Sequence, residues 1–364
     1  MHPRKAAVSV AASILLSYLF TGCSGFFVDQ NTTVSFPVYA ANSGSANVSA
    51  YKLDPNVGTL TTVTGQPFVA NTNPLALGTD SSGFFLYAAN SGGGTTGGIS
   101  GWTVNKDGTL TVMTGSPFSS STPFFAVAVD PTLRFVFAAT NTPSNGIQAF
   151  TVNTGNGILT ATGGLVGTTG APIRMTEDAS GKFLYVAEGA GGVDVFGITA
   201  NSGALTLVQN VPFGAANDIA VDRSTAFAYV ADGGTGVQAF SINASTGALT
   251  AIGAVLPAGN TPMGVTVSPS AQFVYVANSV SGDISAYTSA AGVLTAVAGS
   301  PFGASTTPVS VAVDPSSRFV YVANKGANTI SIYNIDTTTP GKLNTVGSIS
   351  SGTGPNQVLV SPRQ

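Results

Sequence analysis

Four charged side chains stand out in a chain where charge is scarce. Lys, Arg, Asp and Glu together make up 7% of the 364 residues, well below the quarter that is usual. Arg174, Glu188, Asp218 and Asp232 fall at positions that otherwise hold small, hydroxyl or amide side chains. A guanidinium binds anionic groups, and a carboxylate serves as acid, base or hydrogen-bond acceptor. The four residues predict a polar pocket in which Arg174 binds a small anionic ligand and Glu188 or Asp232 transfers protons.

A structural interpretation of the same residues stays open. An ion pair of Arg174 with Asp218 or Glu188 would neutralise the wall of a partly buried channel. Such networks share their sequence signature with functional sites. The sequence alone does not separate the two interpretations.

Other signatures of catalysis and binding are missing from the sequence. The one histidine is His2 and the one cysteine is Cys23, so the chain beyond residue 2 has no imidazole for base catalysis or metal ligation. The glycine-rich run 92–97 precedes a predicted strand rather than a helix, which argues against a dinucleotide site. We expect no metal and no cofactor. A net charge of −3, with no basic cluster beyond the first five residues, predicts no nucleic-acid binding.

The first 22 residues have the pattern of an export signal. Arg4 and Lys5 precede an apolar run over 6–20, which is too short for a membrane-spanning helix. The run ends in Thr21-Gly22-Cys23-Ser24, and this ending resembles the signal of bacterial lipoproteins.

That resemblance implies a lipid-anchored protein of the cell envelope. Cys23 would become the lipidated first residue, residues 23–35 would form a tether, and Ser24 would favour the outer membrane. The membrane is then a partner through the anchor. The alternative is an ordinary secretory signal followed by a free or buried cysteine.

The elements that position the charged residues come from a repeat. Seven related phrases begin at Tyr39, Tyr87, Phe137, Tyr185, Tyr229, Tyr275 and Tyr321. Their spacings are 48, 50, 48, 44, 46 and 46 residues. A near-constant period of this length indicates an array of like units.

One unit, over 307–349, predicts four short strands. They cover 308–313, 319–323, 330–335 and 342–346, with connections of hairpin length. The strands are apolar on both faces, so each sheet must be packed on both sides. Seven sheets around one axis meet this demand, which predicts an all-β, seven-bladed β-propeller with four antiparallel strands per blade over residues 36–362.

The two ends of the chain predict how the ring closes. The first repeat begins at its second strand, 37–41, and the chain ends on an unaccompanied first strand, 355–360. We expect these segments to pair and complete one blade.

Superposing the repeats places the four charged residues. The position after the Tyr-x-Ala phrase holds Asn42, Asn90, Thr140, Glu188, Asp232, Asn278 and Asn324. One position of the inner strand holds Ala76, Ala126, Arg174, Asp218, Gly264, Ser310 and Gln357. The end of one strand lies beside the start of its antiparallel neighbour, so the charges are expected to gather at one mouth of the channel, on blades four and five.

The repeats resemble those of a known family. Phe-Val-Tyr-Val-Ala-Asn at 273–278 and 319–324, Val-Ala-Val-Asp-Pro at 127–131 and 311–315, and Gly-x-Leu-Thr at 292–295 are similar to the Tyr-Val-Thr-Asn-type repeats of lactonase-like seven-bladed propellers. The resemblance covers about residues 36–362. It implies a fold shared by enzymes that hydrolyse 6-phosphogluconolactone, relatives that lactonise muconates, and many envelope proteins.

Two functional hypotheses follow from the resemblance. Lactone chemistry in such families is expected to use His, Glu and Arg, whereas this chain has its histidine at position 2. The first hypothesis is therefore an envelope propeller that binds a small anionic ligand or an envelope protein through one face of the ring. The alternative is a lactone hydrolase that uses Arg174, Glu188 and Asp232.

Overall fold

A computed structural model of the protein describes residues 35–119 and 121–363. The predicted signal peptide, Cys23 and the tether up to residue 34 lie outside these residues. In the described part, no helix is both long and apolar enough to cross a membrane.

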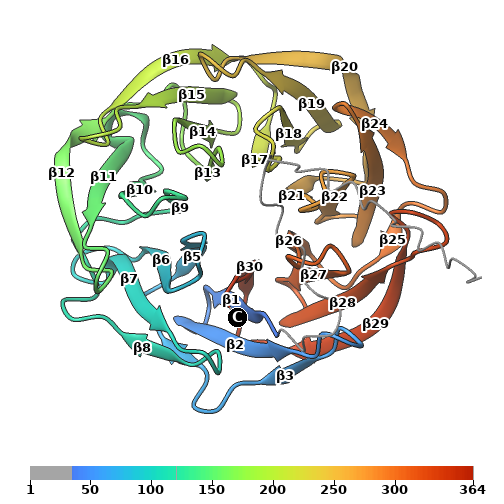
Figure 1. Ribbon diagram of the computed structural model, residues 1–364, viewed down its shortest axis with the longest axis horizontal. Coiled ribbons are helices and arrows are strands. Elements are labelled where there is room, and N and C mark those ends of the chain that lie inside the picture. Colours follow the sequence, from blue (N-terminus) through green and yellow to red (C-terminus); the bar gives the residue numbers. More distant parts are fainter. Residues whose placement is uncertain (1–34, 120, 364) are drawn as a thin grey trace, which may run out of the picture. The chain divides into compact units, whose positions relative to one another are not determined.

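Seven sheets are arranged around a central axis (Figure 1), which confirms the predicted seven-bladed propeller. The strands of each blade are antiparallel and run from the axis outward. The inner strands are β30 (Pro355–Val360), β5 (Pro74–Thr79), β9 (Ala126–Val129), β13 (Arg174–Glu177), β17 (Ala216–Val221), β21 (Pro262–Val267) and β26 (Pro308–Val313). The second strands are β1 (Pro37–Asn42), β6 (Phe85–Ser91), β10 (Phe135–Ala139), β14 (Phe183–Ala187), β18 (Phe227–Asp232), β22 (Phe273–Asn278) and β27 (Phe319–Asn324).

The two remaining strands of each blade lie toward the rim. The third strands are β2 (Asn47–Leu53), β7 (Gly97–Val104), β11 (Ile147–Val152), β15 (Val193–Ile198), β19 (Gly236–Ile242), β23 (Asp283–Ala290) and β28 (Thr329–Ile335). The fourth strands are β3 (Leu60–Thr62), β8 (Leu110–Val112), β12 (Leu159–Val166), β16 (Leu205–Val211), β20 (Leu249–Pro257), β24 (Val293–Ala296) and β29 (Leu343–Ser350). Two-residue strands β4 (Phe68–Val69) and β25 (Phe302–Gly303) extend blades 1 and 6 by pairing with β2 and β23.

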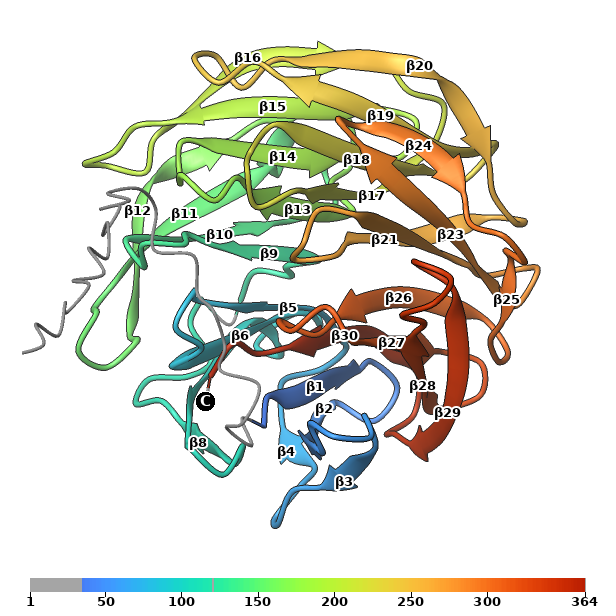
Figure 2. The same cartoon turned by 45° about the vertical axis from the view of Figure 1, so that its right-hand side comes forward.

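The predicted closure of the ring is confirmed. Strand β30 pairs antiparallel with β1, with Val360 opposite Val38 and Val358 opposite Ala40. Figure 2 shows β30 beside β1, with β5 and β26 on its two sides. Blade 1 therefore takes its inner strand from the C-terminal end of the chain and its other strands from the N-terminal end.

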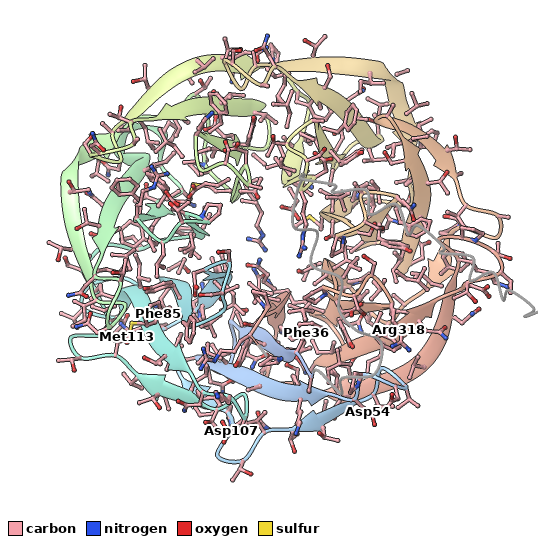
Figure 3. The ribbon with its side chains drawn as sticks, viewed as in Figure 1. Phe36, Asp54, Phe85, Asp107, Met113 and Arg318 are labelled. Carbon is pink, nitrogen blue, oxygen red and sulfur yellow. The ribbon has the colours of Figure 1, made fainter. Side chains whose placement is uncertain are left out.

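Neighbouring blades share apolar cores. One buried cluster joins Tyr87 and Phe85 of blade 2 to Val136 and Phe150 of blade 3, and corresponding clusters lie between the other neighbours in the described part of the chain. Figure 3 shows Phe85 and Met113 side by side where blades 2 and 3 meet. The two apolar faces that the sequence requires are thus buried against different neighbours.

The repeated Phe-x-Tyr segment contacts a glycine turn in the next blade. The Tyr185 hydroxyl donates to the carbonyl oxygen of Gly247 at 3.1 Å, and the Phe183 ring lies where a Cβ on Gly247 would be, with 2.4 Å to its nearest atom. Gly247 also has a φ of +75°, which non-glycine residues rarely adopt. The same tyrosine–carbonyl bond joins Tyr39 to Gly108, Tyr87 to Gly157, Tyr275 to Gly341 and Tyr321 to Gly58.

Blade 3 departs from this pattern because Phe137 replaces the tyrosine. Phe135 still covers Gly203 of blade 4, since a Cβ on Gly203 would lie 2.7 Å from a ring atom of Phe135. No hydroxyl is available for the Gly203 carbonyl from position 137. The contact between blades 3 and 4 therefore has the aromatic packing without the hydrogen bond.

Reciprocal substitutions test the contribution of this bond to stability. Tyr185→Phe should lower the free energy of unfolding by about 1–2 kcal/mol, because a buried carbonyl loses its donor. Phe137→Tyr should raise it by about 1 kcal/mol by supplying the missing donor. Denaturant unfolding of both variants beside the parent chain measures the two effects. Equal stability of Tyr185→Phe and the parent would show that the bond contributes nothing.

Candidate functional site

The inner strands enclose a cavity of about 320 Å³ along the axis. Six polar side chains line it among small and aliphatic ones, those of Arg174, Thr176, Asp218, Thr266, Ser310 and Gln357. Figure 3 shows nitrogen-bearing side chains projecting from the inner strands into the central opening. Ala76 occupies the equivalent position of blade 2, where its small side chain leaves the space open.

Arg174 spans the channel. It is the first residue of β13 in blade 4, yet its Nη2 donates to the backbone oxygen of Asn356 in β30 of blade 1, at 3.3 Å. Its Nη1 donates to the carbonyl of Ile173 at 3.2 Å. Burial lowers the pKa of Arg174, and the negative charge of Asp218 opposes that shift. The guanidinium stays charged, because an arginine pKa begins far above neutrality.

Asp218 faces the same cavity from β17 of blade 5. Its Oδ1 accepts from the backbone N–H of Ile219 and its Oδ2 from that of Val265 in blade 6, both at 2.9 Å. Burial raises the pKa of Asp218 to about 6, while Arg174 and the two N–H donors act in the opposite direction. A carboxyl group with this pKa can accept a proton near neutral pH.

Arg174 and Asp218, on the neighbouring strands β13 and β17, act on each other through their charges without forming an ion pair. Among the described residues, the charged pair within 4.0 Å is Arg134 with Asp130, at 2.6 Å. A group bound between Arg174 and Asp218 would therefore meet a fixed positive and a fixed negative side.

Lys325 and Asn356 add to the mouth of the channel, and the sequence analysis missed both. The Lys325 Nζ donates to Asn356 Oδ1 at 3.0 Å, and Asn356 Nδ2 donates to the carbonyl of Leu75 at 2.8 Å. Desolvation and the nearby Arg174 charge lower the pKa of Lys325. Asn356 thus connects blades 2, 4 and 7 and holds two cationic groups near each other.

A signal for Lys325 was present in the sequence. It lies one residue beyond the superposed position that includes Asn324, where the other repeats hold Ser43, Ser91, Asn141, Gly189, Gly233 and Ser279. Asn356 carried a similar signal, because it lies one residue before Gln357, where the other repeats hold Leu75, Phe125, Ile173, Asn217, Met263 and Val309.

Glu188 lies outside the cavity lining. Its side chain is 2% exposed, and Oε2 accepts from the backbone N–H of Gly170 at 2.6 Å. Burial, together with the Asp194 carboxylate, raises the pKa of Glu188 to about 8, and the Gly170 donor opposes this. The carboxyl group is directed into its own blade.

Asp232 also has a local role. Its Oδ1 accepts from the backbone N–H of Gly234 at 3.0 Å and its Oδ2 accepts from the hydroxyl of Thr235. These bonds stabilise the turn between β18 and β19. Of the four predicted residues, the structure therefore brings Arg174 and Asp218 into one cavity and places Glu188 and Asp232 in neighbouring turns.

The site can bind an anion and accept a proton. Arg174 and Lys325 supply positive charge, and Asp218 supplies a carboxyl group whose pKa is raised to about 6. Within residues 35–119 and 121–363, no group of three or more His, Cys, Asp and Glu side chains is arranged to hold a metal ion.

Comparison with known structures gives the same ring. A candidate 6-phosphogluconolactonase of Bacteroides fragilis superposes with a TM-score of 0.75 at 18% identity, covering 92% of this chain and 99% of that one. The periplasmic gluconolactonase of Pseudomonas aeruginosa superposes with a TM-score of 0.72 at 18% identity, covering 90% of this chain and 99% of that one.

 At these identities, the similarity concerns the fold alone.

Sequence comparison identifies the family. No curated protein sequence matches the chain. The family described as "Lactonase, 7-bladed beta-propeller" matches residues 34–142, 136–232, 190–298 and 292–364, which together span the whole ring. The chain therefore belongs to the lactonase family of seven-bladed β-propellers.

Proposed function

We propose that the protein hydrolyses lactones at the channel mouth. The observation that carries this proposal is the placement of Arg174 and Asp218, from the neighbouring inner strands β13 and β17, in the lining of one cavity in a lactonase-family ring. Two similar structures are named as a candidate 6-phosphogluconolactonase and a gluconolactonase, which supports the same reaction class.

The two side chains divide the chemistry of ester hydrolysis. The Asp218 carboxylate accepts a proton from water while the water oxygen bonds to the lactone carbonyl carbon. The Arg174 guanidinium stabilises the negative charge that develops on the carbonyl oxygen. The ring C–O bond then breaks, and the leaving alkoxide takes the proton from Asp218. The product is a hydroxy acid, and both side chains return to their starting states.

The second cation suggests the substrate class. Lys325 and Arg174 both reach Asn356, so an anionic substituent on the lactone would meet two positive groups. A sugar-acid lactone that carries a phosphate or carboxylate fits this arrangement. A neutral lactone would use Arg174 and leave Lys325 without a ligand.

Ligand binding without turnover is the second candidate. Both oxygens of Asp218 already accept backbone N–H groups, which weakens it as a base, and the one histidine of the chain is His2. An anionic small molecule, or an anionic segment of an envelope protein, would then bind at the same mouth. Direct binding measurements with lactones that are not turned over would favour this function.

Substitutions in the cavity test the hydrolytic function. Arg174→Ala and Asp218→Asn should each lower kcat/KM on a phosphorylated aldonolactone by about 100-fold or more. Lys325→Ala should raise KM for that substrate by about 10-fold and leave a neutral lactone unaffected. Asp232→Asn makes the same change as Asp218→Asn in a turn outside the cavity, and as the matched control it should keep full activity. Full activity in Arg174→Ala or Asp218→Asn would overturn the assignment.

The pH dependence of hydrolysis tests the role of Asp218. The base must be deprotonated, and burial raises the pKa of Asp218 to about 6. The value of kcat/KM should therefore rise about tenfold per pH unit below pH 6 and level off above it. Measurement between pH 4.5 and 8 checks this. A profile without a bend near 6, or the same bend in Asp218→Asn, would assign the proton transfer to another group.

We further propose that the protein is exported and anchored to the envelope, with the outer membrane as its site. The support is the order of Arg4, Lys5, the apolar run and Cys23 in the sequence. One similar structure belongs to a protein named as periplasmic.

Lipid labelling tests the anchor. Labelled palmitate should enter the full chain and co-fractionate with membranes, whereas Cys23→Ser should take up none, because the thiol that would be acylated is gone. Ser24→Ala serves as the neighbouring control and should still be labelled. Persistent labelling of Cys23→Ser would exclude Cys23 as the lipidation site.

A further inference from the structure

A polar pair recurs at the end of the second strand of most blades. An asparagine amide donates to a serine hydroxyl of the third strand at 2.9–3.1 Å. The pairs are Asn42 with Ser49, Asn90 with Ser100, Asn278 with Ser285, and Asn324 with Ser331. In each pair the amide donates and the hydroxyl accepts, and neither group carries a charge, although the amide oxygens of Asn90 and Asn278 are buried without a partner of their own in the described part of the chain.

Blade 4 places two carboxyl groups where those blades have an amide and a hydroxyl. Glu188 follows β14 and Asp194 lies on β15, with exposed fractions of 2% and 0%. Their carboxyl groups accept from the successive backbone N–H groups of Thr169 and Gly170, which brings the two close together. Two ionised carboxylates at this separation in a buried site repel each other strongly.

The surrounding donors leave one oxygen unmatched. Asp194 accepts from the backbone N–H of Thr169 at 2.8 Å, from the Thr169 hydroxyl at 2.9 Å and from the Asn210 amide at 2.8 Å. Glu188 Oε2 accepts from Gly170, whereas Glu188 Oε1 is buried and has no hydrogen-bond partner. A proton on Oε1, donated to Asp194, would satisfy this atom and remove the repulsion.

We propose that Glu188 and Asp194 share one proton and that this pair positions Arg174 by holding the segment 168–172 that leads into β13. The proton-sharing stands on the contacts of Glu188 and Asp194 themselves. Its effect on catalysis rests on the proposed lactone hydrolysis.

The segment 168–172 is packed closely enough for a change at Glu188 to alter the position of Arg174. The backbones of Gly170 and Gly191 approach so closely that a Cβ on Gly170 would lie 2.7 Å from the Gly191 Cα. Four residues later, Arg174 lies opposite Ala187, which directly precedes Glu188. Loss of the bond between Glu188 and Gly170 would loosen the backbone that carries the guanidinium.

The sign of the pH dependence follows from the groups that face Glu188. Asp194 is the charged group acting from β15, and the segment 168–172 and Asn210 of β16 present neutral donors. Burial and Asp194 raise the pKa of Glu188 from 4.5 to about 8. The folded state thus binds this proton more tightly than the unfolded chain does. Its stabilisation is complete below about pH 4.5 and is lost as the pH rises through 8.

Three forms of the full chain test the pair. Glu188→Gln keeps an amide donor for Asp194 and an acceptor for Gly170 but cannot ionise. The double variant Glu188→Asn with Asp194→Ser installs the pair found in blades 1, 2, 6 and 7. Between pH 5 and 8, the unfolding equilibrium constant of the parent should increase with pH. Relative to that of either variant, it should increase by up to tenfold per pH unit. Parallel stability curves for all three would overturn the shared proton.

Hydrogen exchange and kinetics test positioning separately. Above pH 8, amide exchange over 168–171 should accelerate in the parent beyond the intrinsic rise seen in Glu188→Gln, and kcat on a lactone should fall in the parent alone. Matching exchange in the two would overturn the positioning role. If the parent hydrolyses no lactone, the proposed function fails, while the stability and exchange results still decide the acid pair. If the parent and Glu188→Gln both hydrolyse a lactone and the pH profiles of kcat are identical, the positioning role is wrong and the proposed lactone hydrolysis stands.

Discussion

The ring depends on a contact between unlike parts of successive repeats. One blade contributes a phenylalanine ring and a tyrosine hydroxyl, and the next contributes a glycine turn that only a residue without a Cβ can form, as Phe183, Tyr185 and Gly247 show. Because the two halves come from different blades, no blade is satisfied alone. The last blade meets the same demand by joining Tyr321 to Gly58 of the first. This constraint explains why the aromatic phrase and the glycine turn recur together along the chain.

The same constraint explains where charge can survive. The faces of each sheet pack against neighbouring blades, so a charge there loses its hydration and needs donors of its own, as Asp194 has in Thr169 and Asn210. The axial cavity is different, because inner-strand side chains such as Arg174 and Asp218 face space rather than another sheet. Departures from the repeat at those positions change the channel chemistry and leave the packing between blades intact. The ring therefore separates the residues that build it from those that can acquire a function.

The fold was predictable from the sequence to a greater extent than the site. The spacing of the tyrosines fixes the number of blades, and the missing first strand before Pro37 predicts the pairing with β30. Arg174 and Asp218 were located because inner-strand positions face the axis in every blade. Glu188 and Asp232 lie at the same end of their blades, but side chains that follow the second strand bond to local turns. Sequence position gives the height along the axis, whereas the direction of the side chain there depends on the loop.

The closing strand has a consequence for how the protein is made. Asn356 holds both Arg174 and Lys325, and Gln357 accepts from the backbone N–H of Leu77 at 2.7 Å. These contacts belong to β30, which is translated after every other strand of the described ring. A nascent chain can complete six blades and still lack the inner strand of blade 1, so the channel lining is incomplete until β30 has been translated and has paired with β1. A nick that removes β30 would therefore open the ring and, in the same event, remove the contacts of Asn356 with Arg174 and Lys325.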